Sequence, residues 1–149
     1  MERTDKYFHV MESRKSMAAE LKAIREAKKI HVTKLKGRQA IYNFERNPTN
    51  TRASTIEDYM KDLNVEVIFT ILHAGQYNSK SFSEGFRYAI KIRGVRIKDI
   101  ARKTGYSVAQ IEKHVSGRID MPYHRIETLC KALRIKLYFR NLYQQTVDD

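Results

Sequence analysis

Two short segments of the sequence carry the candidate binding residues of this chain. In the first, which follows Gly37, the polar side chains are those of Arg38, Gln39, Tyr42 and Asn43. Arginine can form two hydrogen bonds with guanine, and glutamine or asparagine can do the same with adenine. At helical spacing Ile41 and Phe44 would face inward, so this polar set would face outward. We therefore expect it to meet the base edges of a duplex.

The second segment carries different side chains, and its candidates are Val108, Ala109, Gln110 and Lys113. Val108 and Ala109 can make an apolar contact with a thymine methyl group, but they can form no side-chain hydrogen bond. Gln110 and Lys113 are the polar candidates. We expect the first segment to read bases and the second to hold the duplex mainly through its phosphates.

Basic and hydroxyl side chains surround both segments. Contacts from such side chains to phosphates fix the position of a protein on DNA without reading its sequence. The candidates for this role are Lys34, Lys36, Arg46, Arg96, Lys98, Arg102, Lys103, Ser107 and Arg118. The chain carries 29 Lys and Arg against 17 Asp and Glu, a net charge of +12. A polyanionic partner is the first interpretation because binding releases counterions, although charge also keeps proteins in solution.

The elements that must position these side chains occur twice in the sequence. Residues 37–72 align without a gap with residues 107–142. The identical pairs are Ile41 and Ile111, Ile56 and Ile126, Glu57 and Glu127, Lys61 and Lys131, Leu63 and Leu133, Phe69 and Phe139, and Leu72 and Leu142. Upstream residues match at an offset of 65 positions in place of 70, so the first copy is about five residues shorter just before Gly37. This internal similarity predicts two copies of one structural unit.

Each copy predicts about four short helices followed by one strand, so the fold class is mainly α. In the second copy we expect Ser83 to cap the first helix, a second helix to cover about 97–104, and Ser107 to cap the third. The expected divisions are an N-terminal arm at 1–15, a first unit at 16–72, a linker at 73–82, a second unit at 83–143 and a tail at 144–149.

The last element of each copy alternates between apolar and polar residues, as a half-buried strand does. In the second copy Ile135, Leu137 and Phe139 are the apolar positions, and residues 65–72 are their counterpart. A single strand cannot satisfy its backbone hydrogen bonds, so each needs a partner. Either the two strands of one chain pair antiparallel and form an internal pseudo-dimer, or each pairs with a second chain in a homodimer. The first arrangement is the simpler.

The run from Gly94 to Ile111 resembles the helix-turn-helix of phage repressor and Cro proteins and of the wider XRE family. That family places an apolar residue and alanine in the first helix, glycine in the turn and isoleucine in the second helix, and this chain has Ile100, Ala101, Gly105 and Ile111 there. The resemblance covers about residues 83–135 and, by repetition, 17–65. It implies two lambda-repressor-like units that bind double-stranded DNA, and the terminal strand is similar to that of antitoxin-type members.

The first unit departs from this family pattern in one place. Residues 32–36 leave barely one turn for the helix that supports the recognition helix. The segment from Gly37 to Asn47 nevertheless looks like the family's recognition helix, and Glu45 looks like the glutamate that commonly ends it.

Residues for other kinds of chemistry are sparse. The single Cys130 excludes an internal disulfide, and no Cys/His grouping has metal-site spacing, so we expect no metal and no cofactor. Cys130 is expected to fill the core, and His114 to be a partly buried histidine bonded to the backbone. We find no nucleophile–base constellation, no paired carboxylates and no phosphate-binding glycine loop, so we do not expect an enzyme. No segment has the ~20 apolar residues of a membrane span and no signal-peptide core is apparent, so we expect a cytoplasmic protein.

These observations favour a sequence-specific transcriptional regulator, most simply a repressor that occludes a promoter. One chain would then cover two half-sites about one helical turn apart. The alternative is an antitoxin or anti-defence protein whose main target is another protein, with one unit serving as a docking surface.

Overall fold

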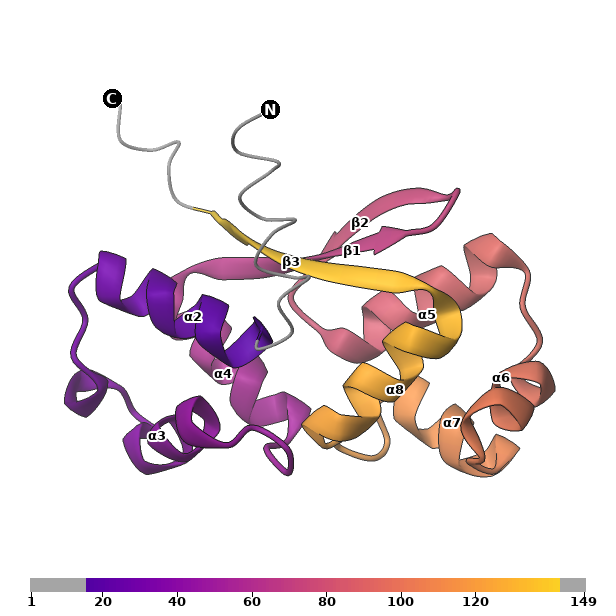
Figure 1. Cartoon of the computed structure of the whole chain (residues 1–149), viewed down its shortest axis with the longest axis horizontal. Coiled ribbons are helices and arrows are strands. Elements are labelled where there is room, and N and C mark those ends of the chain that lie inside the picture. The colour runs from indigo at the N-terminus through magenta and orange to yellow at the C-terminus, as the bar shows by residue number, and fades with distance from the viewer. Residues whose placement is uncertain (1–15, 143–149) are drawn as a thin grey trace.

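The structure is a computed structural model of the chain, and it describes residues 16–142 (Figure 1). Within this range the protein is mainly helical, with seven α-helices and a three-stranded antiparallel sheet. The mainly α fold expected from the sequence is thus confirmed. The expected arm at 1–15 and the tail at 144–149 lie outside the described residues.

The first half of the described chain contains three α-helices and one 3-10 helix before its strand. These elements are α2 (Ser16–Ala27), η1 (Val32–Lys34), α3 (Arg38–Arg46), α4 (Ala53–Leu63) and β1 (Val65–Ile71). Between α2 and α3 the three residues of η1 take the place of a full supporting helix. The short segment before Gly37 predicts this shortening. Asn64 then takes a left-handed conformation with φ of 58°, which ends α4 and turns the chain directly into β1.

The second half contains four helices between two strands. These elements are β2 (Gly75–Ser79), α5 (Phe82–Arg93), α6 (Ile97–Thr104), α7 (Val108–Val115), α8 (Tyr123–Leu133) and β3 (Ile135–Asn141). The helix predicted at about 97–104 is α6. The cap of α5 is Ser81, whose hydroxyl accepts a hydrogen bond from the Glu84 N–H, and Ser83 lies inside the helix, so its predicted capping role is wrong.

The segment at 73–82, expected as a polar linker, contains a strand that the sequence did not predict, because residues 75–79 form β2 and pair antiparallel with β1. His73 and Gly75 have φ of 61° and 86°, and these left-handed conformations allow the chain to reverse tightly after β1. The polar composition of this segment concealed the strand. A strand at the edge of a sheet can be largely solvated, and four of the five β2 residues are exposed or half-buried.

The strand β1 is the centre of the sheet, whose order is β2-β1-β3. It pairs antiparallel with β3 over seven positions, from Val65 opposite Asn141 to Ile71 opposite Ile135. The two terminal strands therefore pair with each other within one chain, as the simpler of the two expected arrangements requires. All the helices lie on one side of this sheet (Figure 1).

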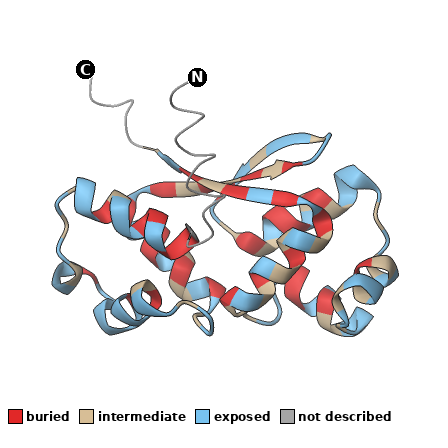
Figure 2. Ribbon diagram, in the orientation of Figure 1, coloured by how far each residue is buried: buried red, intermediate tan, exposed pale blue. Residues whose placement is uncertain are grey.

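The core lies between the sheet and the helices, and both contribute buried residues to it (Figure 2). Val65, Val67, Phe69 and Ile71 are buried while the residues between them are half-buried, as alternation in a one-sided sheet predicts. The Phe69 ring packs edge-on against Phe86 of α5 with 5.3 Å between the ring centroids.

The first turns of α4 and α8 meet across the middle of the molecule. The Ala53 N–H donates to the Met121 carbonyl oxygen at 2.7 Å, and the Tyr123 N–H donates to the Thr51 carbonyl oxygen at 2.8 Å. The Ser54 hydroxyl also donates to the Asp120 carboxylate at 2.5 Å. These hydrogen bonds and the β1–β3 ladder join the two halves at opposite ends of the α4–α8 pair (Figure 1).

Candidate nucleic-acid interface

The helices α6 and α7 are joined by a tight turn with a well-defined start for α7. Gly105 ends α6 with φ of 83°, a conformation that L side chains rarely adopt. The Ser107 hydroxyl accepts a hydrogen bond from the Gln110 N–H, and the Gln110 side chain accepts one from the Ser107 N–H, which together form a capping box. Ile100 and Ile111 are buried between the helices. The turn therefore holds α7 rigidly against α6.

The outer face of α7 carries the residues that the sequence predicts for base contact. Val108 is 40% exposed, and Ala109 and Lys113 are also exposed. Gln110 is half-buried, and its Oε1 atom already accepts the Ser107 N–H at 3.1 Å. The structure thus gives Ser107 and Gln110 a role in starting the helix, while Val108, Ala109 and Lys113 are the exposed members of the predicted base-contacting set.

Basic residues precede and follow α7 in the chain. The exposed residues are Arg96, Lys98, Arg102, Lys103 and Arg118, all of them predicted phosphate ligands. Two of them also meet a carboxylate, since Asp99 lies 3.5 Å from Arg96 and 3.0 Å from Arg102. Such exposed pairs contribute little to stability, so both guanidinium groups can exchange Asp99 for a phosphate at small cost.

The exposed face of α3 carries the other predicted base-contacting residues, because Ile41 and Phe44 point inward and are buried. Arg38, Gln39, Tyr42 and Asn43 are all exposed. The Gln39 Nε2 atom donates to the Asn43 Oδ1 atom at 3.2 Å, so the two amides already hold each other in position. The predicted phosphate ligands Lys34, Lys36 and Arg46 are also exposed, and the Arg46 guanidinium lies 5.4 Å from the centre of the Tyr42 ring.

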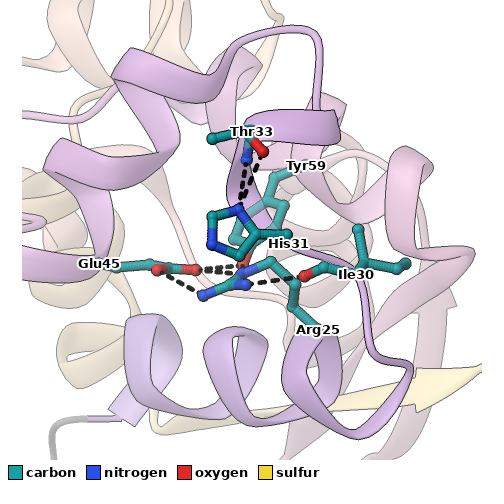
Figure 3. Close-up of polar contacts among 6 residues, drawn as sticks. All are labelled: Arg25, Ile30, His31, Thr33, Glu45 and Tyr59. Carbon is teal, nitrogen blue, oxygen red and sulfur yellow. Dashed lines mark hydrogen bonds and ion pairs between the residues drawn. The ribbon is translucent and has the colours of Figure 1, made fainter.

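A buried ion pair fixes α3 to the helices behind it (Figure 3). Arg25 of α2 donates to both carboxylate oxygens of Glu45, at 2.9 and 3.0 Å, and to the Ile30 carbonyl oxygen at 2.8 Å. The Tyr59 hydroxyl of α4 donates to Glu45 and accepts from Arg25. The Glu45 side chain raises the pKa of Arg25, and burial together with Glu45 raises the pKa of Tyr59. Arg25 and Tyr59 therefore keep their ordinary protonation states near neutral pH.

Sequence reasoning noticed Glu45 but missed Arg25 and Tyr59. The available signal was an arginine four residues after the buried Leu21, on the apolar stripe of a predicted helix. A charged residue in that place is rarely buried without a partner. The network partly compensates for η1, because it ties the end of α3 to α2 and α4 where a full supporting helix is missing.

The two exposed helices occupy similar places at opposite ends of the molecule. Figure 1 shows α3 and α7 on the side of the molecule that lies away from the sheet, with α4 and α8 between them. The outer surfaces of both helices are exposed in Figure 2. One face of the molecule therefore presents two helices, each accompanied by basic side chains.

His114, on the buried face of α7, is fully buried, in place of the partial burial expected. Its Nε2 atom lies 2.7 Å from Arg125, whose guanidinium group in turn lies 4.9 Å from the centre of the Tyr106 ring. Burial, and then the charge of Arg125, lowers the pKa of His114. A neutral imidazole that ties α7 to α8 is the role this environment supports. Cys130 is half-buried against the core, in agreement with its expected role as filler.

The described residues, 16–142, hold no candidate metal centre and no candidate membrane-spanning helix. No group of three or more His, Cys, Asp or Glu residues in this range is arranged to hold a metal ion. Within the same range, no helix is both long enough and apolar enough to cross a bilayer.

Comparison with known families identifies the segment around α6 and α7. Residues 86–137 match the family model of the Cro/C1-type HTH DNA-binding domain, and this segment runs from α5 into β3. No curated protein and no solved structure was found to match the chain. The chain therefore contains one Cro/C1-type HTH domain, a kind of domain that indicates a DNA-binding transcription regulator and is not typically enzymatic.

Proposed function

We propose that the protein is a sequence-specific transcriptional regulator that binds duplex DNA through both α3 and α7 and represses by occluding a promoter. The observation that carries this proposal is the exposed helix α7, held by its capping box behind the Gly105 turn, within a segment that matches a DNA-binding family. The exposed helix α3 lies on the same side of the molecule (Figure 1).

The contacts between the halves support the idea that the chain is a tandem repeat folded as a pseudo-dimer. Ile68 lies directly opposite Tyr138 in the β1–β3 ladder, and these residues are separated by the same 70 positions that align the repeated sequences. Arg52 and Pro122, which form an isolated antiparallel bridge, have the same separation. A residue that pairs with its own equivalent lies on a twofold axis relating the two copies. Both pairs are therefore consistent with one pseudo-twofold axis through the sheet and the α4–α8 seam.

Equivalent contacts within each half give the same indication. Lys28, at the end of α2, donates to the carbonyl oxygen of Leu63, the last residue of α4. Arg93, at the end of α5, donates to the carbonyl oxygen of Leu133, the last residue of α8. In each case a cation binds the C-terminal end of a helix, where the helix dipole favours positive charge.

A twofold relation between α3 and α7 is the geometry with which paired recognition helices enter successive major grooves. Such helices contact half-sites about one helical turn, or roughly 34–36 Å, apart. In our proposal Arg38, Gln39, Tyr42 and Asn43 contact bases in one groove, and Val108, Ala109, Gln110 and Lys113 face bases in the other. The exposed basic residues beside each helix bind the phosphates.

The two helices have different roles in this proposal. Arg38 and the Gln39–Asn43 pair read base edges through hydrogen bonds. By contrast, α7 reads bases only through the apolar side chains of Val108 and Ala109, and with its basic neighbours it adds affinity for duplexes of any sequence. Replacement of Arg38 by alanine should relax base preference. Replacement of Lys113 by alanine should weaken binding to all sequences to a similar extent.

The proposal is tested by selecting duplexes from a random pool with the full chain and measuring their affinity by fluorescence anisotropy. We expect enrichment of one motif, and Arg38→Ala should reduce the preference for that motif over a scrambled duplex. Glu26→Ala, on the exposed surface of α2, is the control and should leave this preference unchanged. Failure to enrich any sequence, together with equal affinity for single-stranded and double-stranded DNA, would contradict the proposal.

Repression is tested separately, with a reporter gene whose promoter overlaps the selected motif. Expression should fall when the motif overlaps the promoter and recover when the motif is moved well upstream. Unchanged or increased expression at the overlapping position would rule out occlusion while leaving DNA binding intact.

A further inference from the structure

The exposed residues of α3 and α7 differ in chemical class at every matched position, although both helices occupy equivalent places in the repeat. Arg38 corresponds to Val108, and Gln39 corresponds to Ala109. Further along, Tyr42 corresponds to Glu112, and Asn43 to Lys113. All eight side chains are exposed.

We propose that the DNA target is non-palindromic, with two half-sites of different sequence in inverted orientation, and that one chain binds it in one direction only. This inference rests on the proposed function and adds the form of the target. A homodimer presents two identical helices and therefore selects an inverted repeat, because operator symmetry mirrors protein symmetry. Here the two helices belong to one chain and are not alike.

The half-site below α3 should be rich in purines read by hydrogen bonds. Arg38 follows Gly37 at the start of the helix, where side chains of a recognition helix reach base edges. The Gln39–Asn43 hydrogen bond occupies Gln39 Nε2 and Asn43 Oδ1. Gln39 Oε1 and Asn43 Nδ2 remain to accept from N6 and to donate to N7 of adenine. At each base pair that receives two such hydrogen bonds, the correct base should be preferred over a wrong one by about 5- to 150-fold.

The half-site below α7 should contain thymine and should be read less strictly. Val108 is 40% exposed, and Ala109 follows it directly, so the two present a small apolar surface at the start of the helix. This surface fits the C5-methyl group of thymine and cannot accept or donate a hydrogen bond. Glu112 is a negative charge where α3 has Tyr42, so this helix also disfavours close approach of phosphate at that position.

The contacts between the halves fix the position of α3 relative to α7. Seven paired positions join β1 to β3, and the bridge between Arg52 and Pro122 joins the first turns of α4 and α8. The halves are thus held in one relative orientation through both ends of the α4–α8 pair. A duplex bound by one chain must therefore meet α3 in one groove and α7 in the other.

The test compares the site selected by the full chain with two palindromic duplexes, each built by duplicating one of its halves. We expect the selected site to bind one chain per duplex, by native mass spectrometry, at least about tenfold more tightly than either palindrome. Equal or tighter binding to the palindrome of the α3 half, with two chains per duplex, would overturn the inference while leaving DNA binding established. Selection of no duplex at all would overturn the proposed function, and the inference with it.

A variant with a remodelled α7 provides the matched experiment. Val108→Arg, Ala109→Gln, Glu112→Tyr and Lys113→Asn together give α7 the exposed residues of α3. This variant should bind the palindrome of the α3 half with one chain per duplex and lose its preference for the original site. All four positions are on the surface, and thermal unfolding checks that the fold is retained. If the folded variant keeps the original preference, α7 does not read its half-site and the inference is wrong.

Discussion

Arg25 and Glu45 form an ion pair with 2.9 Å between Nε and Oε2, inside the protein and 20 residues apart in sequence. In the repeat proposed above, the positions equivalent to Arg25 and Glu45 are Ile90 and Val115, and the equivalent of Tyr59 is Leu129. The first half thus has a charged network where the second half has three aliphatic side chains.

This comparison predicts how the network responds to substitution. Glu45→Ala leaves the Arg25 guanidinium buried without its partner and should lower the free energy of unfolding by about 3–5 kcal/mol. The double variant Arg25→Ile with Glu45→Val adopts the residues of the second half and should recover most of that loss. Urea denaturation measures both values. A double variant no more stable than Glu45→Ala would contradict the equivalence of the two sites.

A second prediction concerns Gly85, on the face of α5 that meets the sheet. A Cβ atom added there would lie 2.1 Å from the Phe69 ring, so an alanine cannot fit unless the ring moves. Gly85→Ala should destabilise the protein by about 1–3 kcal/mol, although alanine favours a helix by about 1 kcal/mol over glycine. Phe69→Leu, introduced as well, removes the clash, and a double-mutant cycle should show coupling between the two sites. Additive effects would show that the contact is not as close as described.

A third prediction concerns pH and Glu20, a buried carboxyl of α2. Burial raises the pKa of Glu20 to about 7 from 4.5, and a backbone hydrogen bond from Phe139 opposes the shift only in part. The unfolded chain therefore loses this proton near pH 4.5, while the folded protein keeps it until about pH 7. Glu20 should lower the free energy of unfolding progressively as pH rises between these values, by up to about 1.4 kcal/mol per pH unit. The loss should persist above pH 7.

Glu20→Gln removes this titration. Relative to the wild type, the variant should gain stability between pH 5 and 7, as measured by urea denaturation across that range. Glu26→Gln, at an exposed position of the same helix, is the control and should show no such gain. An unchanged difference between wild type and Glu20→Gln at pH 5 and pH 7.5 would show that Glu20 is not protonated in the folded state.

A fourth prediction concerns the basic residues around α7. Binding of duplex DNA should weaken with salt, and each phosphate contact should add about 0.9 to the negative slope of log affinity against log salt concentration. Lys98→Ala should therefore reduce the magnitude of this slope by about 0.9, the value of one phosphate contact. Lys131→Ala, in the last turn of α8 near the sheet, should leave it unchanged. Equal effects of the two substitutions would indicate that only overall charge governs binding.

Much of the helical part of the fold could be predicted from the sequence, because its signals are local. The helix at 97–104 followed from its spacing and from Gly105, and the inward positions of Ile41 and Phe44 followed from helical periodicity. The strand β3 followed from strict alternation. In each of these cases the residues that determine the structure lie within a few positions of one another.

The features that sequence reasoning missed depend on contacts between distant residues. The strand β2 has a polar composition, and it exists because β1 offers a free edge after a tight turn. Arg25 becomes a structural residue only when the fold brings Glu45 and Tyr59 to it. The place of Arg25 on an apolar stripe indicates burial, but no local pattern identifies Glu45 and Tyr59 as its partners. The candidate DNA-contacting residues could therefore be named, while the network that holds them could not.

Hydroxyl-radical footprinting of one chain on its selected duplex tests most directly whether α3 and α7 bind the same DNA molecule. We predict two protected stretches about one helical turn apart on one face of the duplex. The triple variant Arg38→Ala, Gln39→Ala and Asn43→Ala should weaken one stretch, and Lys113→Ala with Lys98→Ala should weaken the other. A single protected stretch that survives the α3 substitutions unchanged would contradict the account.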